Sequence, residues 1–81
     1  MAKIRVSQAD IDNCEPSSHD KNCVALALKR LRRRDDIRAF PFLGQVRIGR
    51  RVRDIDDWAA NRLVLHMHGY KIEPFEFDLG G

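Results

Sequence analysis

The strongest constraint on the fold is an apolar stripe in the first half of the chain. Its members follow the i, i+3, i+4, i+7 spacing that lines one face of an α-helix; they are Val24, Ala27, Leu28 and Leu31. This spacing predicts a helix from about Asn22 to Arg34, whose basic C-terminal end suits the helix dipole. A helix with one apolar face needs a second layer to bury it, so the rest of the chain must supply that layer.

Two segments near the ends of the chain alternate between apolar and polar residues, as half-buried β-strands do. In Lys3–Ser7 the apolar positions are Ile4 and Val6. In Pro74–Leu79 the inward positions are Phe75, Phe77 and Leu79. Both segments are predicted to be strands with one face toward the core.

The arginine-rich stretch RIGRRVR, Arg47–Arg53, is predicted to contain the turn of a β-hairpin. If Val46, Ile48 and Val52 share the buried face, the period of two requires a loop with an odd number of residues. Gly49–Arg51 is then a three-residue turn, with Arg47 and Arg53 on the outer face. No strand is predicted between residues 35 and 44, because the proline in RAFPFLG disfavours a central strand.

A second helix is predicted between Asp54 and Gly69. Asp54 suits the N-cap position, and Gly69 suits the position that follows a helix. The apolar face of this helix comprises Ile55, Trp58, Ala59, Leu63 and Met67. Ser7 is predicted to cap one further helical turn after the first strand.

These elements follow the order β-α-β-β-α-β within 81 residues, which is enough for a single domain covering residues 1–81. The order predicts an α+β fold: a small four-stranded antiparallel sheet with two helices on one face, in the ferredoxin-like arrangement. A chain of this size buries only about 60% of its unfolded surface. A deep internal active site is therefore not expected.

The net charge of +3 conceals a strongly basic middle segment. Ten Lys or Arg against two Asp give residues 29–53 a charge of +8, whereas residues 1–28 carry −1 and residues 54–81 carry −4. Such a separation creates a field that steers anionic partners. The candidate contact residues on the first helix and the hairpin are Leu26, Lys29, Arg30, Arg32, Arg33, Arg34, Arg47, Arg50, Arg51 and Arg53.

These side chains have two interpretations. In the first they form a docking surface, with Leu26 as an apolar anchor among cations. The expected partner is then a protein or nucleoprotein complex with an acidic surface, and nucleic acid itself stays open as a partner. In the second interpretation the arginines are a solvated helix face that keeps a small domain soluble, and the preceding loop covers Leu26.

The sequence contains no motif that points to catalysis or to metal binding. Cys14, His19 and Cys23 offer three zinc ligands without the closely spaced pairs of a four-ligand site. His66 and His68 diverge by about 200° on a helix. A nucleophile and base made of Cys14 and His19 would lie on a loop that excludes little water. We therefore expect a non-enzymatic protein that needs no metal and no cofactor.

The chain has neither a signal-peptide pattern nor an apolar run of membrane-spanning length. These features predict an intracellular protein without a membrane partner. In a reducing compartment its two cysteines are expected to be free thiols.

Three segments are similar to a group of small, mostly uncharacterised proteins encoded by bacteriophages and prophages. The segments are IRVSQADIDN, NCVALALKRL and IEPFEFDL. The motifs that carry the resemblance are a helix opening Cys-x-Ala-Leu-Ala-Leu, from Cys23 to Leu28, and a Pro-Phe-x-Phe strand beginning at Pro74. The chain departs from the group at Val24, where proline often follows the cysteine, and in its dense arginines.

The resemblance implies an origin rather than a mechanism, because it brings no catalytic residues. Anti-CRISPR inhibitors encoded by phages include proteins of this size and α+β build, which suggests by analogy a stoichiometric inhibitor of a CRISPR-type host defence complex. Such an inhibitor would act in the cytoplasm of the host bacterium. The alternative is a small basic accessory protein that binds nucleic acid.

Overall fold

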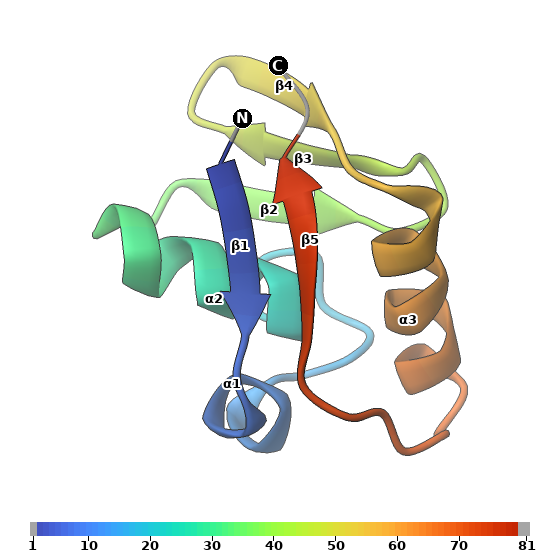
Figure 1. Ribbon diagram of the computed structural model, residues 1–81. Coiled ribbons are helices and arrows are strands. Elements are labelled where there is room, and N and C mark those ends of the chain that lie inside the picture. Colours follow the sequence, from blue (N-terminus) through green and yellow to red (C-terminus); the bar gives the residue numbers. More distant parts are fainter. Residues whose placement is uncertain (1, 80–81) are drawn as a thin grey trace.

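A computed structural model of the protein describes residues 2–79 (Figure 1). Within them the chain forms an α+β fold, as predicted, with the elements β1 Ala2–Val6, α1 Gln8–Asn13, α2 Cys23–Arg32, β2 Ile37–Phe40, β3 Gln45–Ile48, β4 Arg51–Asp54, α3 Asp57–Met67 and β5 Phe75–Leu79. None of the helices in this part of the chain combines the length and the apolar character needed to cross a membrane.

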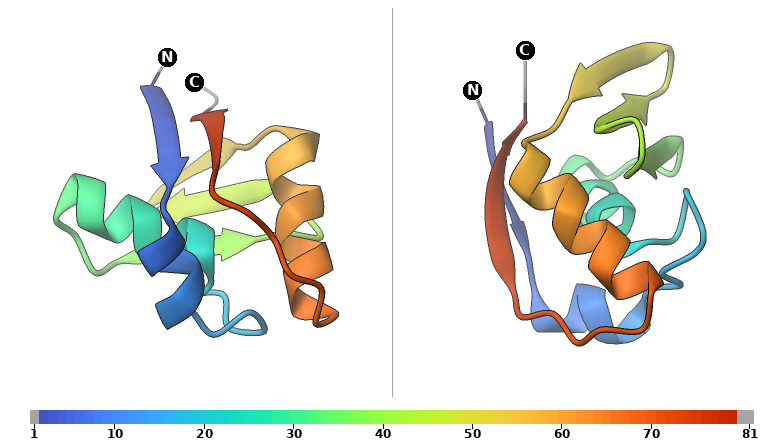
Figure 2. Two further views of the ribbon diagram at one scale, coloured as in Figure 1. Left: turned by 60° about the horizontal axis from the view of Figure 1, so that its bottom comes forward. Right: turned by 90° about the vertical axis from the view of Figure 1, so that its right-hand side faces the viewer.

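The strands form two antiparallel sheets rather than one. β1 pairs with β5, and the second sheet has the order β2-β3-β4. An isolated bridge between Ile55 and Leu79 links the two sheets, which Figure 1 and Figure 2 show on different sides of the molecule. The predicted four-stranded sheet in ferredoxin-like order is therefore wrong, because the hairpin β3–β4 pairs with β2 and not with β1 or β5.

The terminal strands and the first short helix agree with the predictions. Ile4 and Val6 on β1 are buried opposite Phe77 and Phe75 of β5. Ser7 caps α1 through a capping box with Asp10, since each side chain accepts a hydrogen bond from the other residue's backbone N–H. These elements were predictable because alternation and capping are local signals.

α2 lies between the two sheets and contacts β1 on one side and β2 on the other (Figure 2). Because both sides are covered, its first two turns are buried on most of their surface; the buried residues are Cys23, Val24, Ala25, Ala27 and Leu28. Leu31, predicted to complete the buried stripe, is instead 47% exposed. The last turn of α2, which contains Leu31, extends past the edge of β1 (Figure 1).

β2 is a strand that the sequence did not predict. β2 ends at Phe40, so Pro41 comes just after the last paired residue. The missing N–H of the proline therefore costs the sheet no hydrogen bond. Ile37 and Ala39 on β2 are fully buried and lie opposite Ile48 and Val46 of β3. This segment therefore provides one of the three strands of the second sheet and much of its apolar face.

The hairpin β3–β4 turns through two residues, Gly49 and Arg50, rather than the predicted three. Arg47 consequently lies opposite Val52, so Val52 is on the outer face and 56% exposed. Arg53 lies opposite Val46 and thus on the other face from Arg47. The prediction that Val52 is buried and that Arg47 and Arg53 share a face is wrong, because a shift of one residue exchanges the two faces.

α3 begins two residues later than predicted. Asp54 ends β4, and Asp56 is the N-cap residue of α3. Ala59 and Leu63 face the core as predicted, whereas Trp58 is 48% exposed and packs edge-on against Phe75. α3 therefore flanks β5 at the side of the molecule (Figure 1).

Candidate functional site

The basic residues of α2 and of the hairpin meet at one end of the molecule. The chain leaving α2 packs against the β3–β4 turn, where the N–H of Gly49 donates to the carbonyl of Asp36 at 2.9 Å. Four exposed arginines at this end have no ion pair within 4.0 Å among residues 2–79. We call this group the basic end: Arg32, Arg33, Arg50 and Arg51.

Arg30, by contrast, is engaged within the protein. Its Nη2 lies 2.8 Å from Oδ2 of Asp10, and its Nε lies 3.4 Å from Oδ1. Nη2 also donates to the carbonyl of Arg5 at 3.2 Å. Arg30 thus ties α2 to α1 and to the backbone of β1, and it covers part of the free edge of that strand.

The partner of Arg30 is a buried carboxylate. Asp10 is only 7% exposed, and its Oδ2 also accepts the N–H and the hydroxyl of Ser7, both at 2.9 Å. Burial alone raises the pKa of Asp10, but the hydrogen bonds from Arg30 and Ser7 outweigh it and leave the pKa below its ordinary value. The carboxylate is therefore held ionised as part of the fold.

Replacing Arg30 with glutamine is expected to lower the free energy of unfolding at neutral pH by about 1–2 kcal/mol, because the buried carboxylate loses its charged partner while Arg30 itself is half exposed. The pKa of Asp10 is lowered by folding, so this stability is present above the unfolded pKa. It is lost as the pH falls through the folded pKa. Urea denaturation should show the difference from wild type shrinking below about pH 4.

The matched control is Arg32→Gln, which removes the same charge from the same helix at an exposed position that has no ion pair with any described residue. A loss of stability that does not depend on pH, or that equals the loss in the control, would contradict the role assigned to the Arg30–Asp10 pair.

Arg34 is also paired, with Asp36. The pair is bidentate, at 2.8 Å from Nε to Oδ1 and 2.6 Å from Nη2 to Oδ2. The hydrogen bond from Arg34 is the main reason that the pKa of Asp36 is lowered. The pair lies against Gly49, where a Cβ atom would be 2.8 Å from Nη2 of Arg34 and 3.0 Å from Oδ2 of Asp36. It therefore helps to join the α2 end to the hairpin.

Replacing Gly49 with alanine is expected to destabilise the protein by about 2 kcal/mol, since φ is +61° and the new Cβ meets the Arg34–Asp36 pair. Gly44→Ala is the matched control, because φ is +63° there and nothing lies within 4 Å of a Cβ. The control should cost about 1 kcal/mol. Equal losses in urea denaturation would show that the pair does not pack tightly on the turn.

The outer face of the second sheet is balanced in charge. Arg38 and Arg47 lie directly opposite each other on β2 and β3, an unfavourable placement for like charges. Carboxylates offset them, because Asp20 and Asp35 line the same hollow of about 320 Å³, together with Asp36, which is already paired with Arg34. The Nε of Arg47 donates to the carbonyl of Gly49 at 3.1 Å. This face thus contributes less net positive charge than its two arginines suggest.

The most exposed apolar side chains lie on the β2–β3 turn. Phe42 is 70% exposed and Leu43 is 67% exposed. The turn is held by hydrogen bonds from Leu43 N to Phe40 O at 3.1 Å and from Gly44 N to Pro41 O at 3.3 Å. Sequence reasoning missed this pair because it assigned no structure to the segment. Exposed apolar residues on an ordered turn are suited to anchor a contact.

The cysteines and histidines are arranged differently from the pattern in the sequence. The ring of His19 packs against Phe40 with the two planes tilted by 53° and the centroids 4.8 Å apart. Cys14 instead lies beside His66, with Sγ 3.6 Å from Nδ1. The two residues are 52 positions apart, so no local spacing could reveal them. Among residues 2–79, no three side chains of the usual ligand types are grouped so that they could hold a metal ion.

The predicted contact residues fall into three sets. Arg32, Arg33, Arg50 and Arg51 are exposed and make no ion pair within the described part of the chain; Arg30, Arg34 and Arg47 are engaged within the protein; Leu26, Lys29 and Arg53 are partly buried. Leu26 therefore exposes less apolar surface to a partner than Phe42 on the β2–β3 turn.

No family model matches this chain, and neither the curated proteins nor the solved structures contain a match.

Proposed function

We propose that this protein is a non-enzymatic binding protein that docks on an acidic surface of its partner through the basic end. The observation that carries the proposal is the convergence of four exposed arginines, which make no ion pair with residues 2–79, from two elements that are separate in the sequence. Arginine suits such a surface because its planar guanidinium group pairs bidentately with carboxylates and phosphates.

The elements that carry these arginines are fixed by backbone hydrogen bonds. Arg33 is the C-cap of α2, and its N–H donates to the carbonyl of Lys29. Arg50 lies in a tight hairpin turn that is bonded to the chain leaving α2. A surface that is already ordered loses less conformational entropy on binding, which favours tight association.

Two observations favour a protein partner over nucleic acid. Nucleic-acid-binding sheets usually present free aromatic side chains, but here Phe75 and Phe77 are buried and Phe40 lies against His19. Phe42 and Leu43 offer an apolar contact that an apolar pocket on a protein would accept. Nucleic acid is the second candidate, supported by the charge of +8 on residues 29–53.

The similarity to phage and prophage proteins directs the proposal to a particular class of partner. An inhibitor encoded by a phage acts on a host complex in the bacterial cytoplasm, and a CRISPR-type effector presents both acidic protein surfaces and grooves for nucleic acid. In this proposal the basic end occupies one of these surfaces stoichiometrically, without turnover.

A plasmid-interference assay tests the proposal. Bacteria that carry a CRISPR system and a matching target plasmid are transformed with and without expression of this protein, for several system types. Inhibition would raise the transformation efficiency at least about tenfold for one type, and reversing the charges of the basic end would abolish the effect. Unchanged efficiency with every type would contradict the inhibitor proposal.

Titration of labelled random DNA with the purified protein separates the second candidate. A nucleic-acid-binding protein would bind with an affinity that falls steeply as salt increases. Absence of binding at low salt would exclude that candidate and leave a protein partner.

A further inference from the structure

The loop between α1 and α2 brings the two cysteines together. Cys14 is the C-cap of α1, and Cys23 is the first residue of α2. The loop between them is closed at its base, because the N–H of Glu15 donates to the carbonyl of Lys21 at 2.8 Å. Both side chains pack on the same apolar core, Cys23 fully buried and Cys14 partly exposed. Both thiols are free in the structure.

A histidine from the far end of the chain joins this pair. His66, in the last turn of α3, places Nδ1 3.6 Å from Sγ of Cys14. The Cys14 thiol also lies 3.2 Å from the carbonyl of Ile11. The imidazole is therefore positioned to accept the proton of a thiol that is otherwise held by a backbone carbonyl.

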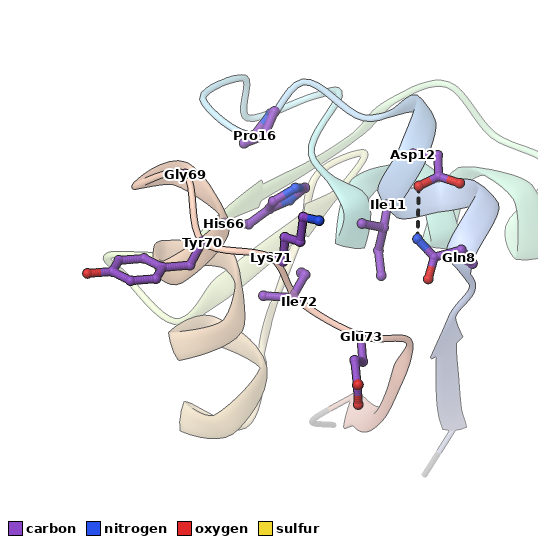
Figure 3. Close-up of a pocket in the computed structure, with 10 residues that line it drawn as sticks. All are labelled: Gln8, Ile11, Asp12, Pro16, His66, Gly69, Tyr70, Lys71, Ile72 and Glu73. Carbon is purple, nitrogen blue, oxygen red and sulfur yellow. Dashed lines mark hydrogen bonds between the residues drawn. The ribbon is translucent and has the colours of Figure 1, made fainter.

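The imidazole of this pair, His66, lines a hollow in the surface of the molecule. Its volume is about 680 Å³, within the range of small-molecule sites. Figure 3 shows His66 and Lys71 on one side and Ile11 on α1 opposite them. Asp12 and Pro16, which also line the hollow, flank Cys14 in the sequence. Cys14 does not itself line the hollow, but it is partly exposed and lies beside His66, which does, so a small solute in the hollow is adjacent to the pair.

The environment distinguishes the two thiols. Burial raises the pKa of Cys23 to about 12, so this thiol is protonated and shielded. Burial also raises the pKa of Cys14, and hydrogen bonding around the thiol offsets this only in part. Because the thiolate is the nucleophile, a thiol of this kind reacts only when a neighbouring base removes its proton. Cys14, which is partly exposed and next to His66, is the one that can react first.

We propose that Cys14, Cys23 and His66 form a thiol–disulfide exchange site whose co-reactant is a low-molecular-weight disulfide that enters from the hollow. The Cys14 proton passes to His66, and the thiolate attacks the disulfide, which forms a mixed disulfide and releases one small thiolate. That thiolate takes up the proton. The Cys23 sulfur then attacks Cys14, loses its proton and releases the second small thiol, so that two protein thiols are oxidised and one disulfide is reduced to two thiols.

Oxidised glutathione is the probe for this site. After incubation with it, the full-length protein is unfolded, alkylated and weighed by mass spectrometry. We expect a loss of two hydrogen atoms, about 2 Da, without alkylation of either cysteine. We also expect the melting temperature to rise by roughly 10 °C, because the new bridge restricts the unfolded chain. Two cysteines that remain alkylatable, or a mixed disulfide that persists in the wild type, would overturn the proposal.

Three variants assign the roles. Cys23→Ser should stop at a stable mixed disulfide on Cys14, and Cys14→Ser should react at least about tenfold more slowly than the wild type, because Cys23 is shielded. His66→Ala should slow bridge formation about threefold to tenfold, with His68→Ala, exposed and two positions away, as the matched control. Equal rates for the two histidine variants would remove His66 from the site. These results do not depend on the proposed docking function.

Discussion

Replacing Asn22 with alanine is expected to lower the free energy of unfolding by about 2–4 kcal/mol, a large part of the stability of so small a domain. Asn22 is 1% exposed and caps α2, because its Oδ1 accepts the N–H of Ala25 at 2.9 Å. Its Nδ2 donates to the carbonyl of Ala39 on β2 at 3.0 Å. Alanine would leave both backbone groups unpaired in the interior. Urea denaturation followed by circular dichroism measures the loss.

Two further variants separate the contributions of Asn22. Asn22→Ser keeps an N-cap acceptor but loses the donor to β2, so it should cost about half as much as alanine. Asn13→Ala makes the same replacement at an exposed asparagine, whose Nδ2 bonds only to the carbonyl of Ala9. It should cost less than about 0.5 kcal/mol. If Asn22→Ala and Asn13→Ala cost the same, the assigned link between α2 and β2 does not exist.

The elements that could be predicted from the sequence are those specified by neighbouring residues. The alternation in β1 and β5, the Ser7 cap and the apolar spacing that begins α2 are local features, and each appears close to its predicted position. Asn22, the most consequential polar residue of the core, was recognisable as a helix start, but its bond to Ala39 was not.

Strand pairing could not be predicted, because it depends on contacts between distant segments. Because Pro41 disfavours a central strand, no strand was predicted where β2 lies. Without β2, the only strands with which the predicted hairpin could pair were β1 and β5. The hairpin register also depended on the assumption that Val52 faces the core. Because the hairpin turns through two residues rather than three, Val52 faces outward beside Arg47, and Arg53 lies on the opposite face.

The charge of the middle segment was visible in the sequence, but its distribution was not. Asp10 neutralises Arg30 across 20 positions, and the carboxylates around Arg38 and Arg47 come from the loop before α2 and the chain after it. Arg30 would therefore be a poor test of docking, because its replacement destabilises the fold. The arginines that remain free lie where the chain turns, at the end of α2 and in the hairpin.

Reversing one free arginine on each of these elements, Arg32→Glu with Arg50→Glu, is expected to weaken partner binding roughly 100-fold, or about 1.4 kcal/mol for each residue. The loss should come mainly from slower association and should shrink at high salt. In the plasmid-interference assay the variant should be inactive. Its stability should stay within about 1 kcal/mol of wild type, because neither side chain makes an ion pair with residues 2–79 and the only expected cost is a negative charge at the C-terminal end of α2.

The control changes the same number of charges at two exposed residues that do not belong to the basic end, Lys21→Glu with Lys71→Glu, of which Lys21 makes only an exposed ion pair with Glu15 at 3.9 Å. It should retain full activity, whereas Arg32→Gln with Arg50→Gln should lie between wild type and the reversed variant. Equal loss in the lysine control would mean that the partner responds to net charge alone. If the reversed variant is as active as wild type, Phe42 and Leu43 become the better explanation of binding, since apolar contacts do not depend on these charges.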